Sequence, residues 1–180
     1  MGMSLDGRLW IISGARGAGK TSLCARLVEM ARQAGWDRAG LLSPAVFEGG
    51  VKTGIAVTDL RGGETRTLAR LTQPGETAAV RTVQWAFDEQ VLAWGDRVLA
   101  QSTPCDLLVV DELGPLEFQR GQGWLAGLAA VDSRAYRLGL LVLRPELLET
   151  AAIRWPDGQV YTVDQGEAAV RDLRALLAGG

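Results

Sequence analysis

The sequence predicts an α/β fold in which a mostly parallel β-sheet is covered by helices and extended by an antiparallel β-hairpin or meander. Short apolar segments alternate with segments whose apolar residues recur at helical spacing, which is typical of parallel strands joined by crossover helices. Between residues 51 and 70 the pattern changes to alternation around a glycine turn, which indicates the hairpin. The chain has 180 residues, and we expect a single domain over residues 1–180.

The first half of the chain opens with a short buried strand, Leu9 to Ser13, which leads directly into a glycine-rich loop. A helix is expected from Thr21 to Ala34, because apolar residues recur at helical spacing and Gly35 follows as a stop signal. The hairpin consists of VKTGIAVTDL and ETRTLARL, joined by RGG. The segment TQPGETAAV then predicts a loop, and VQWAF a further strand.

The second half alternates again between helices and buried strands. Asp88 is placed to cap a helix that continues to about Ala100. Three apolar segments, CDLLVVDE, LGLLVL and QVYTVD, are expected to be strands of the parallel sheet. A closing helix follows Gly166, with Val170 and Leu173 on its apolar side.

Composition limits the partners and the location of the protein. The formal net charge is −2, so no bulk attraction to nucleic acid or to an anionic membrane is expected. No apolar run approaches the roughly 18 residues of a membrane span, and the first residues lack the layout of a signal peptide. We therefore expect a cytoplasmic protein without a membrane or nucleic-acid partner.

The residue types that are missing limit the chemistry. The chain has no histidine, which excludes Ser-His catalysis and histidine ligation of metals. Its cysteines, Cys24 and Cys105, lack metal-ligand spacing and are expected to be buried free thiols in a reducing compartment. Carboxylates, hydroxyls, arginines and a lysine remain as candidate functional groups.

The segment GARGAGKT matches the phosphate-loop pattern G-x-x-x-x-G-K-[ST] at every fixed position, between a predicted strand and a predicted helix. Glycines let backbone N–H groups converge on phosphate oxygens, and the helix N-terminus adds partial positive charge. Lys20 is expected to reach the β- and γ-phosphates, and the Thr21 hydroxyl to ligate Mg²⁺. We assign nucleotide binding to the following residues: Gly14, Ala15, Arg16, Gly17, Ala18, Gly19, Lys20, Thr21 and Ser22.

A pair of carboxylates, Asp111 and Glu112, ends the strand LLVV. Ligands of open α/β sheets bind at the carboxyl ends of the strands, which places this pair near the phosphate loop. Asp111 is expected to hold Mg²⁺ together with Thr21. Glu112 is the candidate catalytic base that orients and deprotonates water beside the γ-phosphate, with Lys20 as the catalytic cation.

The segment VVDELGPLEF resembles the second motif of the THEP-type P-loop nucleoside-triphosphatases, D-E-I-G-x-M/L-E. The matching residues are Asp111, Glu112, Gly114, Leu116 and Glu117. The family also carries a β-meander between its two motifs, similar to VKTGIAVTDLRGGETRTLAR, and the resemblance covers most of residues 8–165, loosely outside the motifs. It implies a RecA-like three-layer fold and Mg²⁺-dependent hydrolysis of ATP, GTP and other nucleoside triphosphates to the diphosphate and phosphate, with broad base tolerance.

Two residues depart from this family pattern. Pro115 stands where many relatives carry a lysine, and Arg16 stands where relatives often have proline. Arg16, Arg120 and Arg144 are candidates for contact with the γ-phosphate, although surface or ion-pair roles are commoner for such residues. Glu117 either belongs to the active site or braces the turn after it.

Two other functions share the same motifs. A nucleoside or nucleotide kinase needs the phosphate loop and Mg²⁺, although no arginine-rich lid segment is visible. An accessory protein that switches with bound nucleotide, attached to a cofactor-maturation partner, needs only binding. Trp85 and Trp124 are candidates for stacking on a base, and no base-reading motif is present.

Overall fold

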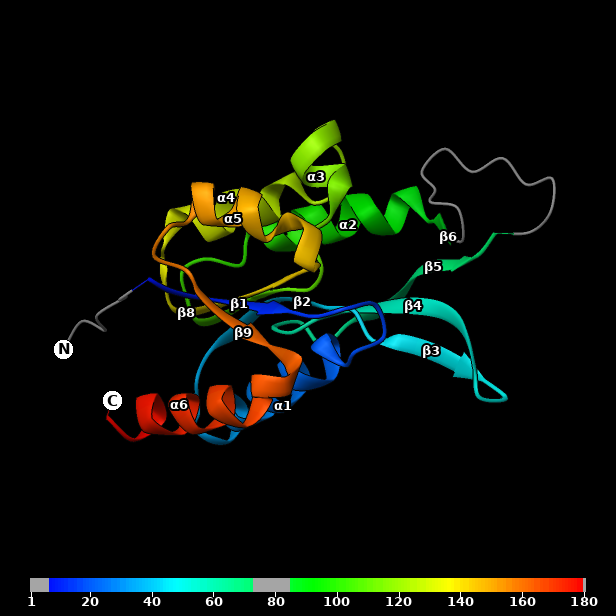
Figure 1. Ribbon diagram of the computed structural model, residues 1–180. Helices are drawn as coiled ribbons and strands as arrows, with labels where there is room; N and C mark the ends of the chain where they lie inside the picture. The colour runs from blue at the N-terminus through cyan, green and yellow to red at the C-terminus, as the bar shows by residue number, and fades with distance from the viewer. Residues whose placement is uncertain (1–6, 73–84, 180) are drawn as a thin grey trace.

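The computed structural model describes residues 7–72 and 85–179, and in this part of the chain nine strands form one sheet with helices on both faces (Figure 1). The strands are β1 (Arg8–Ser13), β2 (Arg38–Leu42), β3 (Ala45–Glu48), β4 (Val51–Asp59), β5 (Thr65–Leu71), β6 (Trp85–Phe87), β7 (Cys105–Val110), β8 (Tyr136–Leu143) and β9 (Gln159–Thr162). The helices are α1 (Lys20–Gln33), α2 (Glu89–Ala100), α3 (Pro115–Arg120), α4 (Leu125–Ser133), α5 (Leu148–Arg154) and α6 (Gly166–Ala178), with 3₁₀ turns η1 (Pro145–Leu147) and η2 (Val163–Gln165).

The strand order is β6-β5-β4-β2-β7-β8-β1-β9, and β3 pairs with β4. Strands β2, β7, β8, β1 and β9 run parallel, whereas β3, β4, β5 and β6 form an antiparallel meander beside β2. Strand β8 lies between β1 and β7 and pairs with both. The α/β class with parallel strands and an antiparallel addition is confirmed, and the addition contains two more strands than a hairpin.

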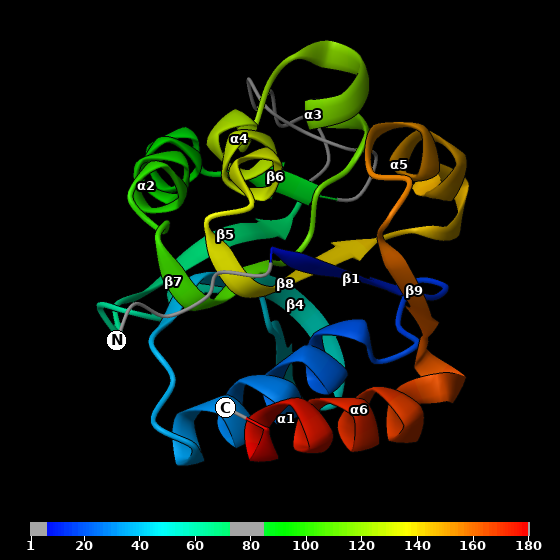
Figure 2. The same ribbon diagram turned by 90° about the vertical axis from the view of Figure 1, so that its left-hand side faces the viewer.

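Two apolar cores fill the space between the sheet and the helices. Helices α1 and α6 cover one face, and α2, α4 and α5 cover the other (Figure 2). Side chains alternate along β1, so that Leu9 and Ile11 belong to the core under α2 and α4, and Trp10 and Ile12 to the core under α1 and α6. Both faces of the central strands β1, β7 and β8 are buried over most of their length, which explains why these strands are mostly apolar.

Most of the predicted elements are present. The first helix begins at Lys20 and ends at Gln33, one residue earlier at each end than predicted. Asp88 caps α2, because its Oδ1 accepts hydrogen bonds from the backbone N–H groups of Gln90 (2.9 Å) and Val91 (3.1 Å). The predicted loop TQPGETAAV, beyond Thr72, lies outside the described residues, as do the first two residues of VQWAF.

Five elements were not predicted from the sequence: β2, β3, α3, α4 and α5. Strands β2 and β3 are five and four residues long, too short to show a period. Helix α3 has six residues, which is too short to show a helical period. Helix α4 is apolar on most of its sides, because it lies against α2 over the sheet, and it therefore lacks an amphipathic pattern.

No helix in the described ranges is long and apolar enough to cross a membrane. Both cysteines, Cys24 and Cys105, are buried free thiols, as predicted.

Candidate active site

The phosphate loop connects the end of β1 to the start of α1. Gly17 and Gly19 adopt φ angles of 76° and 100°, which side chains with a Cβ rarely accept. Lys20 is only 7% exposed, and its Nζ donates hydrogen bonds to the carbonyl oxygens of Gly14 (2.9 Å) and Ala15 (3.1 Å). The ammonium group therefore lies over the loop, beside the backbone groups that the sequence assigns to phosphate binding.

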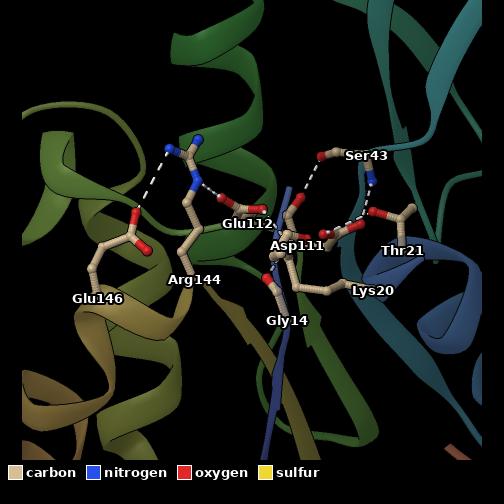
Figure 3. A network of polar contacts seen from close by, with 9 residues as sticks. Gly14, Lys20, Thr21, Ser43, Asp111, Glu112, Arg144 and Glu146 are labelled. Atoms are coloured by element: carbon tan, nitrogen blue, oxygen red, sulfur yellow. Dashed lines mark hydrogen bonds and ion pairs between the residues drawn. The ribbon is translucent and has the colours of Figure 1, made fainter. Parts of the chain in front are cut away.

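Asp111 follows β7 and faces the start of α1 (Figure 3). Its Oδ1 accepts a hydrogen bond from Thr21 Oγ1 at 3.3 Å, and its Oδ2 accepts one from the Ser43 backbone N–H at 3.0 Å. The Ser43 hydroxyl also donates to the Asp111 carbonyl oxygen. Burial raises the pKa of the Asp111 carboxyl to about 6, although the hydrogen bonds from Ser43 and Thr21 oppose that shift.

Glu112 is held between two cations. Arg144, which follows β8, donates from Nε to Glu112 Oε1 at 2.7 Å, and Lys20 Nζ lies 3.8 Å from Glu112 Oε2 (Figure 3). Arg144 also lies 4.0 Å from the Glu146 carboxylate. The two proposed catalytic side chains, Lys20 and Glu112, are therefore neighbours, and Arg144 fixes the direction of the carboxylate.

Glu117 braces the turn that follows the carboxylate pair. Its Oε2 accepts a hydrogen bond from the Gly114 backbone N–H at 2.8 Å, and its Oε1 accepts one from the Trp124 backbone N–H at 2.9 Å. Burial raises its pKa, and these backbone hydrogen bonds oppose the rise. The carboxylate thus satisfies two backbone donors and ties the ends of the α3 segment together, which is the bracing role considered for this residue.

A cavity of about 1280 Å³ opens over these groups. Its lining includes both carboxylates and the three arginines considered for phosphate contact, Arg16, Arg120 and Arg144. Six of the nine assigned loop residues line it, and Gly14, Ala15 and Ala18 do not. Trp85 and Trp124 also belong to the lining, although both side chains are buried. The indole Nε1 of Trp124 already donates to the Leu92 carbonyl oxygen at 3.2 Å, which fixes that ring.

Two polar residues of the cavity lining were missed by the sequence analysis, Ser43 and Lys52. Ser43 lies where the chain leaves β2 for β3, and Lys52 lies in β4. Neither belongs to a motif. The signal that could have indicated Lys52 is its rarity, because it is one of only two lysines among 19 basic residues.

The donor set around Thr21 and Asp111 fits Mg²⁺. One hydroxyl and one carboxylate lie within hydrogen-bond distance, beside the loop that is proposed to hold the phosphates. Among residues 7–72 and 85–179, no group of three or more histidine, cysteine, aspartate or glutamate residues could hold a metal ion. Mg²⁺ is commonly held by one or two protein oxygens together with substrate phosphates and water, and this set provides such oxygens.

Comparison with known proteins agrees with this geometry. A family model described as NTPase matches residues 10–165. The chain belongs to this NTPase family. The nucleoside-triphosphatase THEP1 of Ignicoccus hospitalis is 32% identical over 108 residues, which cover 60% of each chain. The THEP1 of Methanosarcina acetivorans is 27% identical over 157 residues, which cover 86% of this chain and 87% of that protein.

The match to the first relatives is partial, since it spans 60% of the Ignicoccus protein and 59% of the THEP1 of Methanopyrus kandleri. The family fold extends further. The solution structure of a human cancer-related nucleoside triphosphatase has a TM-score of 0.68 to this chain and is 21% identical. The match covers 93% of this chain and 98% of the human chain, so the likeness in fold extends over nearly the whole of both chains.

Proposed function

We propose that the protein is a Mg²⁺-dependent nucleoside triphosphatase that converts ATP, GTP and other nucleoside triphosphates to the diphosphate and phosphate. The observation that carries this proposal is the convergence of four side chains at the carboxyl ends of the parallel strands. Lys20 and Thr21 come from the phosphate loop, and Asp111 and Glu112 from the end of β7.

Each of these side chains has a distinct role in the proposed reaction. Lys20 and the loop amides bind the β- and γ-phosphates, and Thr21 and Asp111 supply oxygens to Mg²⁺. When bound, Mg²⁺ neutralises charge on the phosphate oxygens. Glu112 accepts the proton of the attacking water, and Arg144 holds its carboxylate in place.

Water is the proposed acceptor of the γ-phosphoryl group, because Glu112 stands directly after Asp111, the aspartate assigned to Mg²⁺. Glu112 has one oxygen 2.7 Å from Arg144 and its other oxygen 3.8 Å from Lys20, so the carboxylate lies at the end of the site where the γ-phosphate is expected. We propose that the site tolerates different nucleotide bases, because its polar contacts come from residues assigned to the phosphates and to Mg²⁺.

The test is phosphate release from ATP, GTP, CTP and UTP with Mg²⁺, with and without added nucleosides and nucleoside monophosphates. We expect turnover of all four triphosphates without an acceptor, within about two orders of magnitude, or roughly 2.7 kcal/mol in transition-state binding. Turnover that requires an added nucleoside or monophosphate would identify a kinase instead. Binding without any turnover would identify a nucleotide switch.

A further inference from the structure

Strand β4 extends past the edge of the sheet where the proposed active site lies. Leu42, the last residue of β2, pairs with Thr58 of β4, and β4 runs antiparallel to β2. The six residues that precede Thr58, back to Lys52, therefore continue beyond the carboxyl end of β2, over about 20 Å at ~3.3 Å per residue. Figure 1 shows β3 and β4 projecting beyond the body of the molecule. Near the start of β4, Lys52 lines the same cavity as the phosphate loop.

Lys52 lines the same cavity as four other cations, Arg16, Lys20, Arg120 and Arg144. Its Nζ lies 4.9 Å from the centre of the Trp85 ring, so the ammonium rests on an aromatic face. Burial lowers the Lys52 pKa, the nearby charges of Arg16, Arg144 and Lys20 lower it further, and Glu112 opposes them. Five cations and three carboxylates line this cavity, and the excess of positive charge favours a polyanionic ligand such as a triphosphate.

We propose that Lys52 contacts the terminal phosphate of the substrate and so lets the protein distinguish a nucleoside triphosphate from a diphosphate. This inference rests on the proposed function. The charges that act on Lys52 identify the terminal phosphate as its target, because Glu112, Arg144 and Lys20 form the end of the site where the γ-phosphate is expected. A lysine at this position recognises the phosphate as a point charge with three donors.

A purely structural role for Lys52 would be the packing of its side chain on Trp85. The chain offers a matched control for that role in Arg66 of β5, whose guanidinium lies 4.5 Å from the centre of the Trp94 ring. Arg66 belongs to the same meander but does not line the cavity. Arg66 also pairs with Glu64 at 2.8 Å, so removing its charge reports the loss of a cation–π contact and of a surface ion pair away from the ligand.

The experiment compares Lys52→Met, Lys52→Arg and Arg66→Met with the unsubstituted protein. Calorimetry measures the Kd of ADP and of the non-hydrolysable β,γ-imido analogue of ATP, each with Mg²⁺. We expect Lys52→Met to weaken binding of the analogue about tenfold or more, the loss typical of a charge-assisted contact, and to change the Kd of ADP less than about twofold. Lys52→Arg should largely retain the preference for the analogue, and Arg66→Met should leave both constants unchanged.

Three results would overturn the inference: equal weakening of both ligands by Lys52→Met, no weakening of either, or the same selective loss in Arg66→Met. Phosphate release and ligand binding by the unsubstituted protein distinguish failure of this inference from failure of the proposed function. If it releases no phosphate from any triphosphate, the proposed function fails. If it hydrolyses triphosphates and prefers the analogue to ADP while Lys52→Met keeps that preference, the role of Lys52 alone fails.

Discussion

Arg144 Nε lies 2.7 Å from Glu112 Oε1, so an arginine from the end of β8 holds the carboxylate at the end of β7. The two strands are parallel neighbours, and the contact joins residues that are 32 positions apart in the chain. A carboxylate held in this way loses little freedom when water enters the site, which suits the proposed role of Glu112 as the base that accepts a proton from that water.

The first prediction concerns Glu112→Gln. The variant keeps the shape of the side chain and loses its basic oxygen, so it should bind ATP·Mg²⁺ about as well as the unsubstituted protein. Single-turnover phosphate release should be at least ~100-fold slower, as is typical when a general base is lost. A kcat above about a tenth of the normal value would show that water is activated elsewhere. Loss of nucleotide binding would assign Glu112 to the metal site or to the fold.

The second prediction concerns Lys20→Ala. Removing the buried ammonium that lies over Gly14 and Ala15 should abolish tight binding of triphosphates and their turnover. Equilibrium binding of a fluorescent ATP analogue and phosphate release measure the two effects. Arg26→Ala is the control, because Arg26 lies on the same helix, is half exposed and pairs with Glu167 outside the cavity. Normal phosphate release by Lys20→Ala would contradict the phosphate-loop assignment.

The third prediction concerns the metal ion. EDTA should stop phosphate release, and added Mg²⁺ should restore it, because Thr21 and Asp111 provide hard oxygen ligands. Asp111→Asn should raise the Mg²⁺ concentration needed for half-maximal rate. Asp157→Asn is the matched control, since Asp157 is exposed and pairs with Arg134 away from the cavity. Full activity in EDTA would eliminate the metal site.

The fourth prediction concerns stability and pH. Asp132 of α4 accepts hydrogen bonds from Arg154 Nε (3.1 Å) and Trp155 Nε1 (2.8 Å), and these groups lower its pKa. A lowered pKa in the folded state stabilises the fold above the unfolded pKa of about 4 and ceases to do so as the pH falls through the folded value. Asp132→Asn should therefore lower Tm at pH 7 by about 2–4 °C, the shift for a loss of roughly 1 kcal/mol.

Thermal unfolding between pH 3 and pH 7 checks this prediction. The Tm difference between Asp132→Asn and the unsubstituted protein should narrow as the pH falls below about 4 and disappear below the lowered folded pKa, where the aspartate is protonated in both states. A difference that stays constant over this range would show that the charge of Asp132 does not stabilise the contact between α4 and α5.

The place of the phosphate loop between a strand and a helix could be predicted because its constraints are local. The positive φ angles of Gly17 and Gly19 and the position of Lys20 arise within one short segment, and a motif records such constraints directly. The carboxylate pair was predictable for a similar reason. Asp111 and Glu112 end an apolar strand, and strands of this class present ligands at that end.

Ser43 and Lys52 could not be predicted, because their positions depend on pairings between distant strands. Ser43 faces Asp111 because β2 pairs with β7. Lys52 lines the cavity because β4 pairs with the end of β2 and continues beyond it. The contact of Arg144 with Glu112 likewise requires β8 to lie beside β7. The sequence indicated the strands of the parallel sheet, but strand order depends on packing energies that no short pattern records.

The place of β8 in the sheet also determines when nucleotide affinity can arise during folding. Thr21 and Asp111 are 90 residues apart, and the strands that carry them, β1 and β7, are joined through β8. A growing chain that ends before Tyr136 has the phosphate loop and both carboxylates but no strand to hold them in register. Contacts of such long sequence separation form late and slowly. We therefore expect ATP binding to require the completed parallel sheet, and chains that end before β8 to bind no nucleotide.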